Sequence, residues 1–593
     1  MILLQAEHGT DPVSSLMTAP PKYLLADETL EDAVLRMRRF SLKKAPVVDN
    51  HESRRVLGVL DRFAAEKALD FNLHKAPVGE YADIDVQVVQ GDALLPVAVD
   101  IIMTTRQRCI PIVDDAQRLI GIVSRADVTR LLAENPSAFA TPKAVTNSLA
   151  LEMRRQLPKK LVALMRKIGK IGDELGVRVY VAGGFVRDLL LNVENDDVDL
   201  VVEGDGVSFA DALHDRLGSD IRRHRQFGTA TVTIDGLKVD VATARLEYYP
   251  QPASMPAVEP SSLKMDLGRR DFSFNALALV LNPKSFGDLV DFYAGQADLT
   301  AGRVRVIHAL SLVDDPTRAF RAVRFEQRYG FTITKQTARL IEACVAKGSL
   351  AELTPGRLWT EWCKLTKDVR PVETLLRAER GFKLLSSAIH PSLTTLDAAL
   401  MKAVVEAAAR VAAADDEVVP RLEYVFAMAL FRDTTVLATV LAEKFALSGS
   451  PLNEVVQGAQ AVRSGLGVLR RALKDEQAPT IPATLYRLMA GWSPSSLALA
   501  LALSPKADDL ILRFVVDLRK RRPTLTGARL RDDFGLEPCA AFGPLLRRAF
   551  DDQLNGTLPS DQDALERYIS ENLQAIREER EAGADHQSTT REP

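Results

Sequence analysis

The most informative motif of the chain reads Val-Ala-Gly-Gly-Phe-Val-Arg-Asp at 181–188, followed by Asp-Val-Asp-Leu-Val-Val at 197–202. The pair Gly183-Gly184 follows an apolar run, and glycines there let a loop approach a polyphosphate with its backbone N–H groups as donors. Asp197 and Asp199 lie on a β-branched run, where residues two apart point to the same face of a strand. An isolated Asp-x-Asp is most often an exposed strand end. The glycine pair, one helix-length upstream, favours instead a cation-binding nucleotide site.

Length and composition restrict the class of protein. A chain of 593 residues exceeds one hydrophobic core, so we expect at least three domains. The net charge of −3 indicates that any nucleic-acid site must be local. The sequence has no signal peptide and no apolar run near the ~20 residues of a membrane span. Its four cysteines lack metal-ligand spacing and predict reduced thiols in a cytoplasmic protein (Cys109, Cys344, Cys363 and Cys539).

The N-terminal region contains an internal repeat. Ala45-Pro-Val-Val-Asp49 recurs as Ile110-Pro-Ile-Val-Asp114, and Leu57-Gly-Val-Leu-Asp-Arg62 recurs as Ile120-Gly-Ile-Val-Ser-Arg125. Each copy predicts a helix, two short strands joined by a turn, and a second helix. The repeat resembles a tandem pair of CBS domains over residues 10–135.

The CBS resemblance implies a sensor of adenosyl nucleotides and a homodimer formed through the pair. The family holds the ribose with a hydroxyl and an aspartate, and the second copy supplies Ser124 and Asp127 at those places. The first copy has Asp61 and Ala64 there, so one of the two sites looks degraded. Alternatively, Asp127 only places a negative charge in the first turn of a helix, and the module is a scaffold.

Another carboxylate lies in a predicted hairpin. Phe227–Ile234 and Lys238–Arg245 read as strands joined by an Asp-Gly turn. Asp240 is in the middle of the second strand among apolar neighbours, a costly place for a charge without a partner. It is either a third metal carboxylate or half of a salt bridge to Lys238 or Arg245.

The segment Asp266-Leu-Gly-Arg-Arg-Asp-Phe-Ser-Phe-Asn275 combines charged and apolar residues, and we expect it to open an apolar helix. Arg269 and Arg270 can clamp phosphates, and Asp271 can accept a ribose hydroxyl. Asp271 could instead serve only as an N-cap or first-turn charge.

A further segment reads Asp314-Asp-Pro-Thr-Arg-Ala-Phe-Arg321. The spacing of Asp315, Arg318 and Arg321 predicts one helical face. An aspartate beside an arginine can present an acceptor and donors to the edge of a base. A self-paired ion couple on a solvated helix is the alternative.

Together and in this order, the blocks over 179–330 resemble the head and neck of class II tRNA nucleotidyltransferases and bacterial poly(A) polymerases. The resemblance implies that Asp197 and Asp199 hold two Mg²⁺ ions, with Asp240 as third carboxylate. It also implies the residues that bind the nucleotide. Gly183, Gly184 and Arg187 would contact the triphosphate, and Arg269, Arg270 and Asp271 would contact the triphosphate and ribose, with Asn275 as a further nucleotide-binding residue. Asp315 and Arg318 would contact the base of CTP or ATP, with Arg321 in support. The family usually has Glu at Asp314 and Ile at Phe274, which leaves base selection open.

The resemblance predicts a multidomain fold, α/β followed by all-α. We expect the CBS pair at 10–135, a Pro-containing linker at 136–155, a mixed-sheet head at 156–300 and a neck at 301–375. A helical, tRNA-binding body and tail follow at 376–575, and a charged segment at 576–593 is expected to be disordered. Residues 525–538 resemble the family's C-terminal element, within a local basic patch that either contacts RNA phosphates or is a solvated cationic face (Arg519, Lys520, Arg521, Arg522, Arg529 and Arg531).

These patterns predict an enzyme that adds C, A or both to the tRNA 3′ end by two-metal nucleotidyl transfer. A poly(A) polymerase is the alternative of the same chemistry, and an adenylate-sensing regulator with an inactive head is the alternative of another class. The intact carboxylates argue against the regulator. Larger relatives often carry an N-terminal DHH phosphoesterase domain, for which we expect no room before the repeat.

Overall fold

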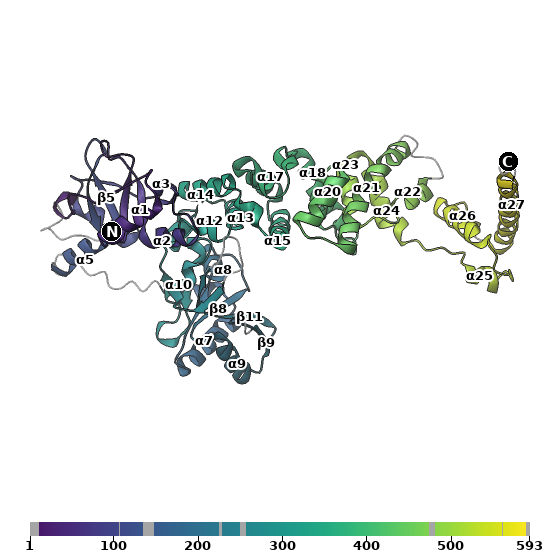
Figure 1. Cartoon of the computed structure of the whole chain (residues 1–593). Helices are drawn as coiled ribbons and strands as arrows, with labels where there is room; N and C mark the ends of the chain where they lie inside the picture. Colours follow the sequence, from purple (N-terminus) through teal and green to yellow (C-terminus); the bar gives the residue numbers. More distant parts are fainter. Residues whose placement is uncertain are drawn as a thin grey trace. The chain divides into compact units, whose positions relative to one another are not determined.

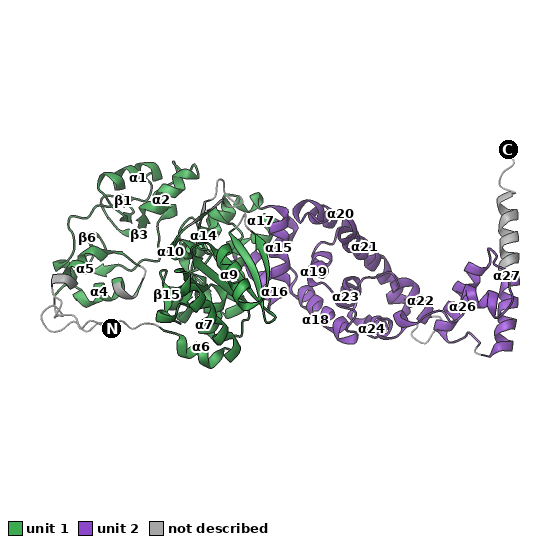
Figure 2. Cartoon of the chain, turned by 90° about the horizontal axis from the view of Figure 1, so that it is seen from below, with its two compact units in different colours: residues 1–353, 382–388 green, residues 354–381, 389–593 purple. Residues whose placement is uncertain are grey.

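The computed structural model describes residues 11–105, 107–134, 148–224, 228–248, 257–473, 481–559 and 561–588. The chain forms two compact units (Figure 2), one of residues 1–353 with 382–388 and one of residues 354–381 with 389–593. Among the described residues, no helix is long and apolar enough to cross a membrane.

The predicted repeat forms two similar α/β copies in the first unit. Each has a three-stranded sheet in which the first pair of strands is parallel and the second antiparallel. The elements are η1 (Val13–Ser15), β1 (Leu24–Leu25), α1 (Leu30–Arg39), β2 (Lys44–Val48), β3 (Val56–Asp61) and α2 (Arg62–Asp70), then α3 (Val78–Tyr81), β4 (Val89–Gln90), α4 (Leu95–Thr104), β5 (Cys109–Val113), β6 (Leu119–Ser124) and α5 (Arg125–Glu134).

The two copies exchange their first segments. Val13 packs in the apolar core of the second copy, and Val78 packs in the core of the first. The core of the first copy also contains Leu310, which is fully buried and lies far along the chain. The first copy is therefore completed by a residue of the segment that follows the head.

The head is built on a seven-stranded sheet of order β15-β14-β7-β8-β11-β10-β9. Figure 1 labels three of its strands, β8, β11 and β9. Its strands are β7 (Arg178–Ala182), β8 (Val198–Glu203), β9 (Asp220–His224), β10 (Thr229–Ile234), β11 (Leu237–Thr243), β14 (Leu277–Val280) and β15 (Leu289–Asp291), and its other elements are α6 (Ala150–Gln156), α7 (Lys159–Glu174), α8 (Gly184–Leu191), α9 (Gly206–Leu217), β12 (Arg245–Tyr248), β13 (Ala257–Pro260), α10 (Leu263–Gly268), η3 (Ser273–Asn275) and η4 (Pro283–Ser285).

Alternate residues of the central strands face two different layers. On β8, Val198, Leu200 and Val202 pack with α7, α8 and α9 in one core. Val201 packs on the other side with Leu263 and Leu267 of α10. Because side chains alternate along a strand, Asp197 and Asp199 share the α10 side with Val201.

The expected apolar helix after Asn275 is wrong. Residues 273–275 form the 3-10 helix η3, and 277–280 form the strand β14. Leu277 and Leu279 enter one core while Ala276 and Ala278 enter the other. A strand buried on both faces has a continuous apolar sequence, which periodicity cannot distinguish from a buried helix.

The remaining part of the first unit is mostly helical and carries the second nucleotide motif. It consists of α11 (Gly295–Thr300), β16 (Arg303–Val304), α12 (Ser311–Asp314), α13 (Arg318–Tyr329), β17 (Thr332–Ile333), α14 (Lys335–Ala346), η5 (Ser349–Glu352) and α17 (Leu384–Ala388).

The second unit is helical throughout its described elements. They are α15 (Pro355–Thr366), α16 (Pro371–Leu376), η6 (Arg377–Gly381), η7 (Pro391–Thr394), α18 (Ala398–Ala414), α19 (Leu422–Leu430), α20 (Thr434–Thr439), η8 (Val440–Lys444), α21 (Gly449–Ala472), α22 (Ile481–Met489), α23 (Pro494–Leu503), η9 (Pro505–Ala507), α24 (Asp508–Val516), η10 (Leu518–Lys520), α25 (Gly527–Asp532), α26 (Phe542–Asn555) and α27 (Gln562–Ser588).

Two predicted irregular segments contain helix. The expected linker 136–155 includes the start of α6 at Ala150, and its residues 136–147 lie outside the described part. The expected disorder from 576 is wrong as far as Ser588, where α27 ends. Arg, Glu and Ala dominate that stretch, and these strong helix formers continue a helix without an apolar face.

Candidate active site

Three carboxylates meet on the α10 side of the sheet. β8 and β11 are parallel neighbours in which Asp199 pairs with Asp240. Asp197 directly precedes β8, and each of the three side chains offers an oxygen within 4.8 Å of the others. The register therefore brings together the residues that the sequence predicted as a metal triad, across more than 40 residues of chain.

The charges of this triad are unevenly balanced. Burial, followed by the nearby carboxylates of Asp197 and Asp240, raises the pKa of Asp199 to about 6. Although burial opposes the shift, hydrogen bonds from Lys238 and Thr231 lower the pKa of Asp240. The Lys238 Nζ lies 2.7 Å from Asp240 Oδ2, so the predicted salt bridge exists beside the triad. An excess of negative charge gathered on hard oxygen ligands fits a divalent cation such as Mg²⁺.

The glycine loop is placed beside this triad by β7. Gly183 has φ +82°, and a Cβ there would lie 2.3 Å from Nη1 of Arg270. Gly184 opens α8, the helix expected between the glycines and the Asp-x-Asp motif. Glycine at 183 thus meets both the left-handed backbone and the close approach of an arginine.

Arg187 is directed into the protein interior. Its guanidinium donates to both carboxylate oxygens of Asp188 and, over 2.8 Å, to Oδ1 of Asn275. It also lies over the rings of Phe325 and Tyr329. These contacts link α8 to η3 and α13, whereas a triphosphate contact by Arg187 stays a prediction.

Asp266, fully buried in α10, holds the two adjacent arginines. Arg269 donates to Oδ1 of Asp266 over 3.0 and 2.7 Å, and Arg270 donates to Oδ2 over 3.5 Å. A charge-assisted pairing of this kind fixes where a guanidinium can reach. Arg270 is also close enough to oppose the raised pKa of Asp199, so it borders the triad.

Asp271 connects the head to α13. It is 8% exposed, accepts from Nε of Arg321 over 2.8 Å, and accepts from Nδ2 of Asn275 over 2.9 Å. Although burial opposes the shift, Arg321 and Asn275 lower the pKa of Asp271 and keep it ionised. Asp271 is therefore more than an N-cap charge, since it pairs with a residue 50 positions away.

The expected single helical face of Asp315, Arg318 and Arg321 is wrong in one respect. Asp315 follows α12 in an extended conformation, and α13 begins only at Arg318. Pro316 explains the break, because a proline disfavours helical backbone in the residue before it. Asp315 accepts from the backbone and hydroxyl of Thr317, while Arg318 donates to the Ser311 hydroxyl and the Arg269 carbonyl, both over 2.6 Å.

The candidate CBS ribose pair is internally bonded. The Ser124 hydroxyl donates to Asp127 over 2.6 Å, and Arg130 forms an ion pair with the same carboxylate. Asp127 lies in the first turn of α5, as the alternative interpretation expected. Neither residue lines the large cavity between this module and the head.

Most cations of the C-terminal basic patch have acidic neighbours. Arg521 forms two hydrogen bonds of 2.9 Å with Asp517, and Lys520 pairs with Asp415. The other pairs are Arg519 with Glu417, Arg529 with Asp533 and Arg531 with Asp532. Arg522 differs, because it donates to backbone carbonyls of Arg519 and Arg521. The paired cations lower the local excess of positive charge that the sequence predicted.

Sequence reasoning missed the residues that hold the predicted ones in place. Asp188, Asp266 and Thr231 each bond a predicted site residue, and Asp188 and Asp266 are buried. The sequence offered one signal for Asp188, because this aspartate directly precedes the apolar run Leu189-Leu190-Leu191. Nothing local indicated which arginine it would meet.

Comparison with known proteins agrees with this geometry. A model of the poly A polymerase head domain matches residues 179–305, and a CBS domain model matches 13–69 and 78–134. An A-adding tRNA nucleotidyltransferase of Geobacter sulfurreducens is 41% identical over 390 residues, 64% of this chain and 44% of the relative. That of Halalkalibacterium halodurans is 30% identical over 423 residues, 70% of this chain and 93% of the relative.

Solved structures give the same result. The Thermotoga maritima CCA-adding enzyme complexed with tRNA has a TM-score of 0.57 and 30% identity, covering 72% of this chain and 98% of that chain. CCA-adding enzyme structures with ATP and with CTP have TM-scores of 0.60 and 0.59. The chain spans less than half the length of the Geobacter relative and most of that from Halalkalibacterium. The predicted fold class is confirmed, and the chain belongs to the class II tRNA nucleotidyltransferases, with a tandem CBS pair before the head.

Proposed function

We propose that this protein extends the 3′ end of tRNA by template-independent nucleotidyl transfer, with A as the nucleotide added. The observation that carries the proposal is the carboxylate triad, bordered by Arg270 on the same side of the sheet. The choice of A is supported by the relatives from Geobacter and Halalkalibacterium, both named A-adding enzymes. Addition of CC or CCA and poly(A) synthesis are the competing outcomes of the test.

Asp197, Asp199 and Asp240 would hold Mg²⁺, as two ions. Bound there, the ions would activate the RNA 3′-hydroxyl and stabilise the departing pyrophosphate. The protein's own contribution is to gather three carboxylates whose repulsion in the metal-free site is only partly offset by Lys238. A cation bound there would relieve the repulsion between the carboxylates that the metal-free fold already contains.

The nucleotide would be oriented by the groups that surround this triad. Gly183 lets the backbone come close to a phosphate, and Arg269 and Arg270, aimed by Asp266, offset charge on the triphosphate. Asp271 would accept from the ribose hydroxyls and favour ribonucleotides. Asp315 and Arg318 would pair with the base edge, as acceptor and donors.

A primer-extension assay tests this proposal. tRNA transcripts ending before C74, after C75 and complete are offered ATP or CTP separately, with an unrelated RNA as control. We expect a single A on the transcript that ends after C75. Addition of C rejects A specificity, and a long A tail on the unrelated RNA indicates a poly(A) polymerase. The variant D197A/D199A should be inactive, and equal incorporation by it would reject the site assignment.

An adenosyl nucleotide in the CBS module is proposed separately. Its support is a cavity of about 1940 Å³ between the module and the head, which Arg108 and Arg125 line with cations suited to phosphates, although Ser124 and Asp127 do not line it. Titration calorimetry with ATP and AMP tests it, and S124A/D127A should weaken binding if those residues hold the ribose. Binding that S124A/D127A leaves unchanged would reject that role. A CBS-mediated homodimer and a cytoplasmic location stay predictions, the first testable by sedimentation velocity.

A further inference from the structure

The segment that leads into the base-reading pair is anchored in the CBS module. Leu310 is fully buried in the core of the first copy, and Val313 packs against the same core. Leu310 directly precedes α12, and Val313 is the third of its four residues, next to Asp314. A short helix held against the module by both residues has little freedom to move independently of it.

An ion pair joins the same helix to α2 of the module. Lys67 Nζ lies 2.6 Å from Asp314 Oδ2, and the Asp314 side chain is 3% exposed against 25% for Lys67. Among the described residues, the other carboxylate oxygen, Oδ1, is buried without a hydrogen-bond partner. His308 Nε2 stands 3.6 Å from Oδ2, so Lys67 makes the closest ionic contact. A carboxylate this buried depends on its partner for its charge to be tolerated.

The held helix in turn holds Arg318. Ser311, the first residue of α12 and fully buried, accepts from Nη1 of Arg318 over 2.6 Å. Asp315 directly follows Asp314, the last residue of α12, so the position of Asp314 constrains that of Asp315. Both members of the base-reading pair therefore depend on α12, one through a hydrogen bond and one through the chain.

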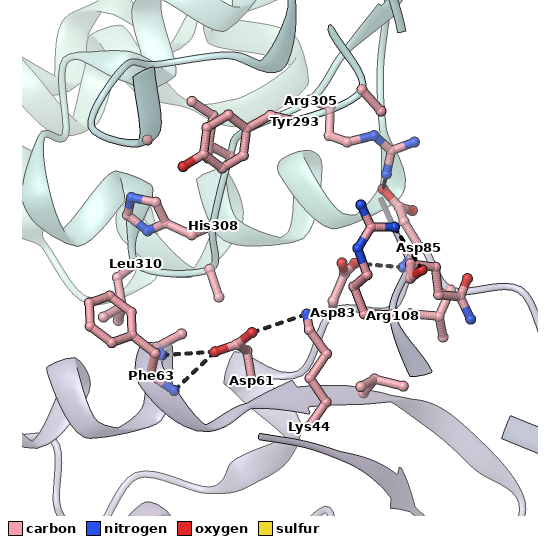
Figure 3. A pocket seen from close by; sticks show the side chains of 18 of the residues that line it. Lys44, Asp61, Phe63, Asp83, Asp85, Arg108, Tyr293, Arg305, His308 and Leu310 are labelled. Carbon is pink, nitrogen blue, oxygen red and sulfur yellow. Dashed lines mark hydrogen bonds and ion pairs between the residues drawn. The ribbon is translucent and has the colours of Figure 1, made fainter. Parts of the chain in front are cut away.

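A second chain of contacts reaches the ribose motif. Asp85 of the CBS module pairs with Nη1 of Arg305 over 2.7 Å, and Arg305 also pairs with Asp298. Asp298 accepts from the Ser273 hydroxyl over 2.7 Å, two residues beyond Asp271. Figure 3 shows Asp85, Arg305, His308 and Leu310 around the cavity between the module and the head.

We propose that Lys67 of the CBS module is a positioning residue for nucleotide selection, acting through Asp314 on Asp315 and Arg318; this rests on the proposed function. By this proposal, the N-terminal module contributes to the function of the nucleotide site. Its contribution is geometric, because Lys67 touches neither substrate nor the carboxylate triad.

The test compares full-length variants on the tRNA transcript ending after C75, with ATP and CTP in separate reactions. K67M keeps the apolar stem and removes the charge. It should raise KM for the preferred nucleotide about tenfold and lower discrimination between the two nucleotides about tenfold, with kcat changed less than about threefold. The matched control is K347M. Lys347 pairs with Glu80 of the same module, and both side chains are about 40% exposed. Because an exposed ion pair contributes little, K347M should behave as wild type.

A double-mutant cycle keeps the test decisive if K67M misfolds. K67M removes the closest ionic partner of a buried carboxylate and leaves His308 Nε2 3.6 Å away, whereas D314N and K67M/D314N remove the carboxylate charge itself. If Lys67 acts through Asp314, the double variant shows the same loss of discrimination as a single variant. Wild-type discrimination in the double variant, or a changed thermal stability with unchanged KM and discrimination in K67M, overturns the proposal.

R318A separates this inference from the proposed function. If R318A discriminates as wild type does, the base-reading role itself is wrong. If R318A loses discrimination while K67M and D314N keep it, only the role of Lys67 is wrong.

Discussion

Replacing Asp199 by Asn should stabilise the metal-free protein while abolishing nucleotide incorporation. Asp199 is ionised at neutral pH in a place that disfavours its charge, because burial and two neighbouring carboxylates raise its pKa to about 6. Asn has nearly the same shape and carries no charge. The substitution therefore removes the repulsion that a bound cation would otherwise neutralise.

The magnitude follows from the pKa shift. The ordinary value is 3.8 and the folded value about 6, and each pKa unit corresponds to about 1.4 kcal/mol. Between these values the folded protein holds a proton that the unfolded chain has lost, so stability falls as pH rises through this window. The full cost is present above pH 6, and D199N should recover about 2–3 kcal/mol there and almost nothing below pH 4.

Hydrogen–deuterium exchange of β8 and β11 peptides in EDTA measures this gain where it arises. All three tryptophans (Trp359, Trp362 and Trp492) belong to the second unit, so their fluorescence would not report on the head. D197N is the comparison variant: it removes one of the two neighbouring charges but leaves Asp199 buried beside Asp240, so it should stabilise the metal-free protein less than D199N does. Mg²⁺ should stabilise the wild type and not D199N. A D199N that is less stable than wild type at pH 7.5 in EDTA would refute the reasoning.

Three further outcomes are expected. G183A should lower incorporation at least tenfold, since the positive φ costs about 1–2 kcal/mol and the new Cβ would lie 2.3 Å from an arginine nitrogen. The control G236A has the same φ and open space around it, so it should cost only the backbone strain. Equal activities of G183A and G236A would contradict this prediction. K238M should lower the Mg²⁺ concentration for half-maximal activity up to about fivefold, because an exposed cation that competes for Asp240 is removed. A higher Mg²⁺ requirement in a titration would be the wrong sign. R522A should reduce the salt dependence of tRNA binding by about one unit of slope, and R521A by less, since Arg521 is already paired with a carboxylate; equal slopes in filter binding would argue against that ranking.

The sequence was sufficient to predict that three carboxylates converge, but not how the residues around them are held. Asp197, Asp199 and Asp240 were identifiable because each is a charge in a β-branched or apolar run. Their convergence needed only the rule that alternate residues share a face, together with one parallel strand pairing. The local sequence pattern and the geometry of the sheet indicate the same residues, which is why the predicted convergence of the three carboxylates is confirmed.

The errors arose where tertiary contacts override local pattern. The strand β14 was predicted as a helix because both its faces are buried. Asp315 was placed on a helix that starts three residues later, although Pro316 was visible in the sequence. The pairing of Lys67 with Asp314 spans 247 positions, and no spacing rule connects residues so far apart.

The burial of Leu310 in the first CBS copy also has a consequence for synthesis. Roughly 230 residues separate that copy from the leucine that completes its core, and a ribosome needs on the order of 10–45 s to translate them. During this interval the first copy has emerged while its apolar surface lacks Leu310 and Val313. The N-terminal module can therefore finish folding only after the head has been made, so an early stop codon before 310 would release a product whose first copy is left with an exposed apolar face.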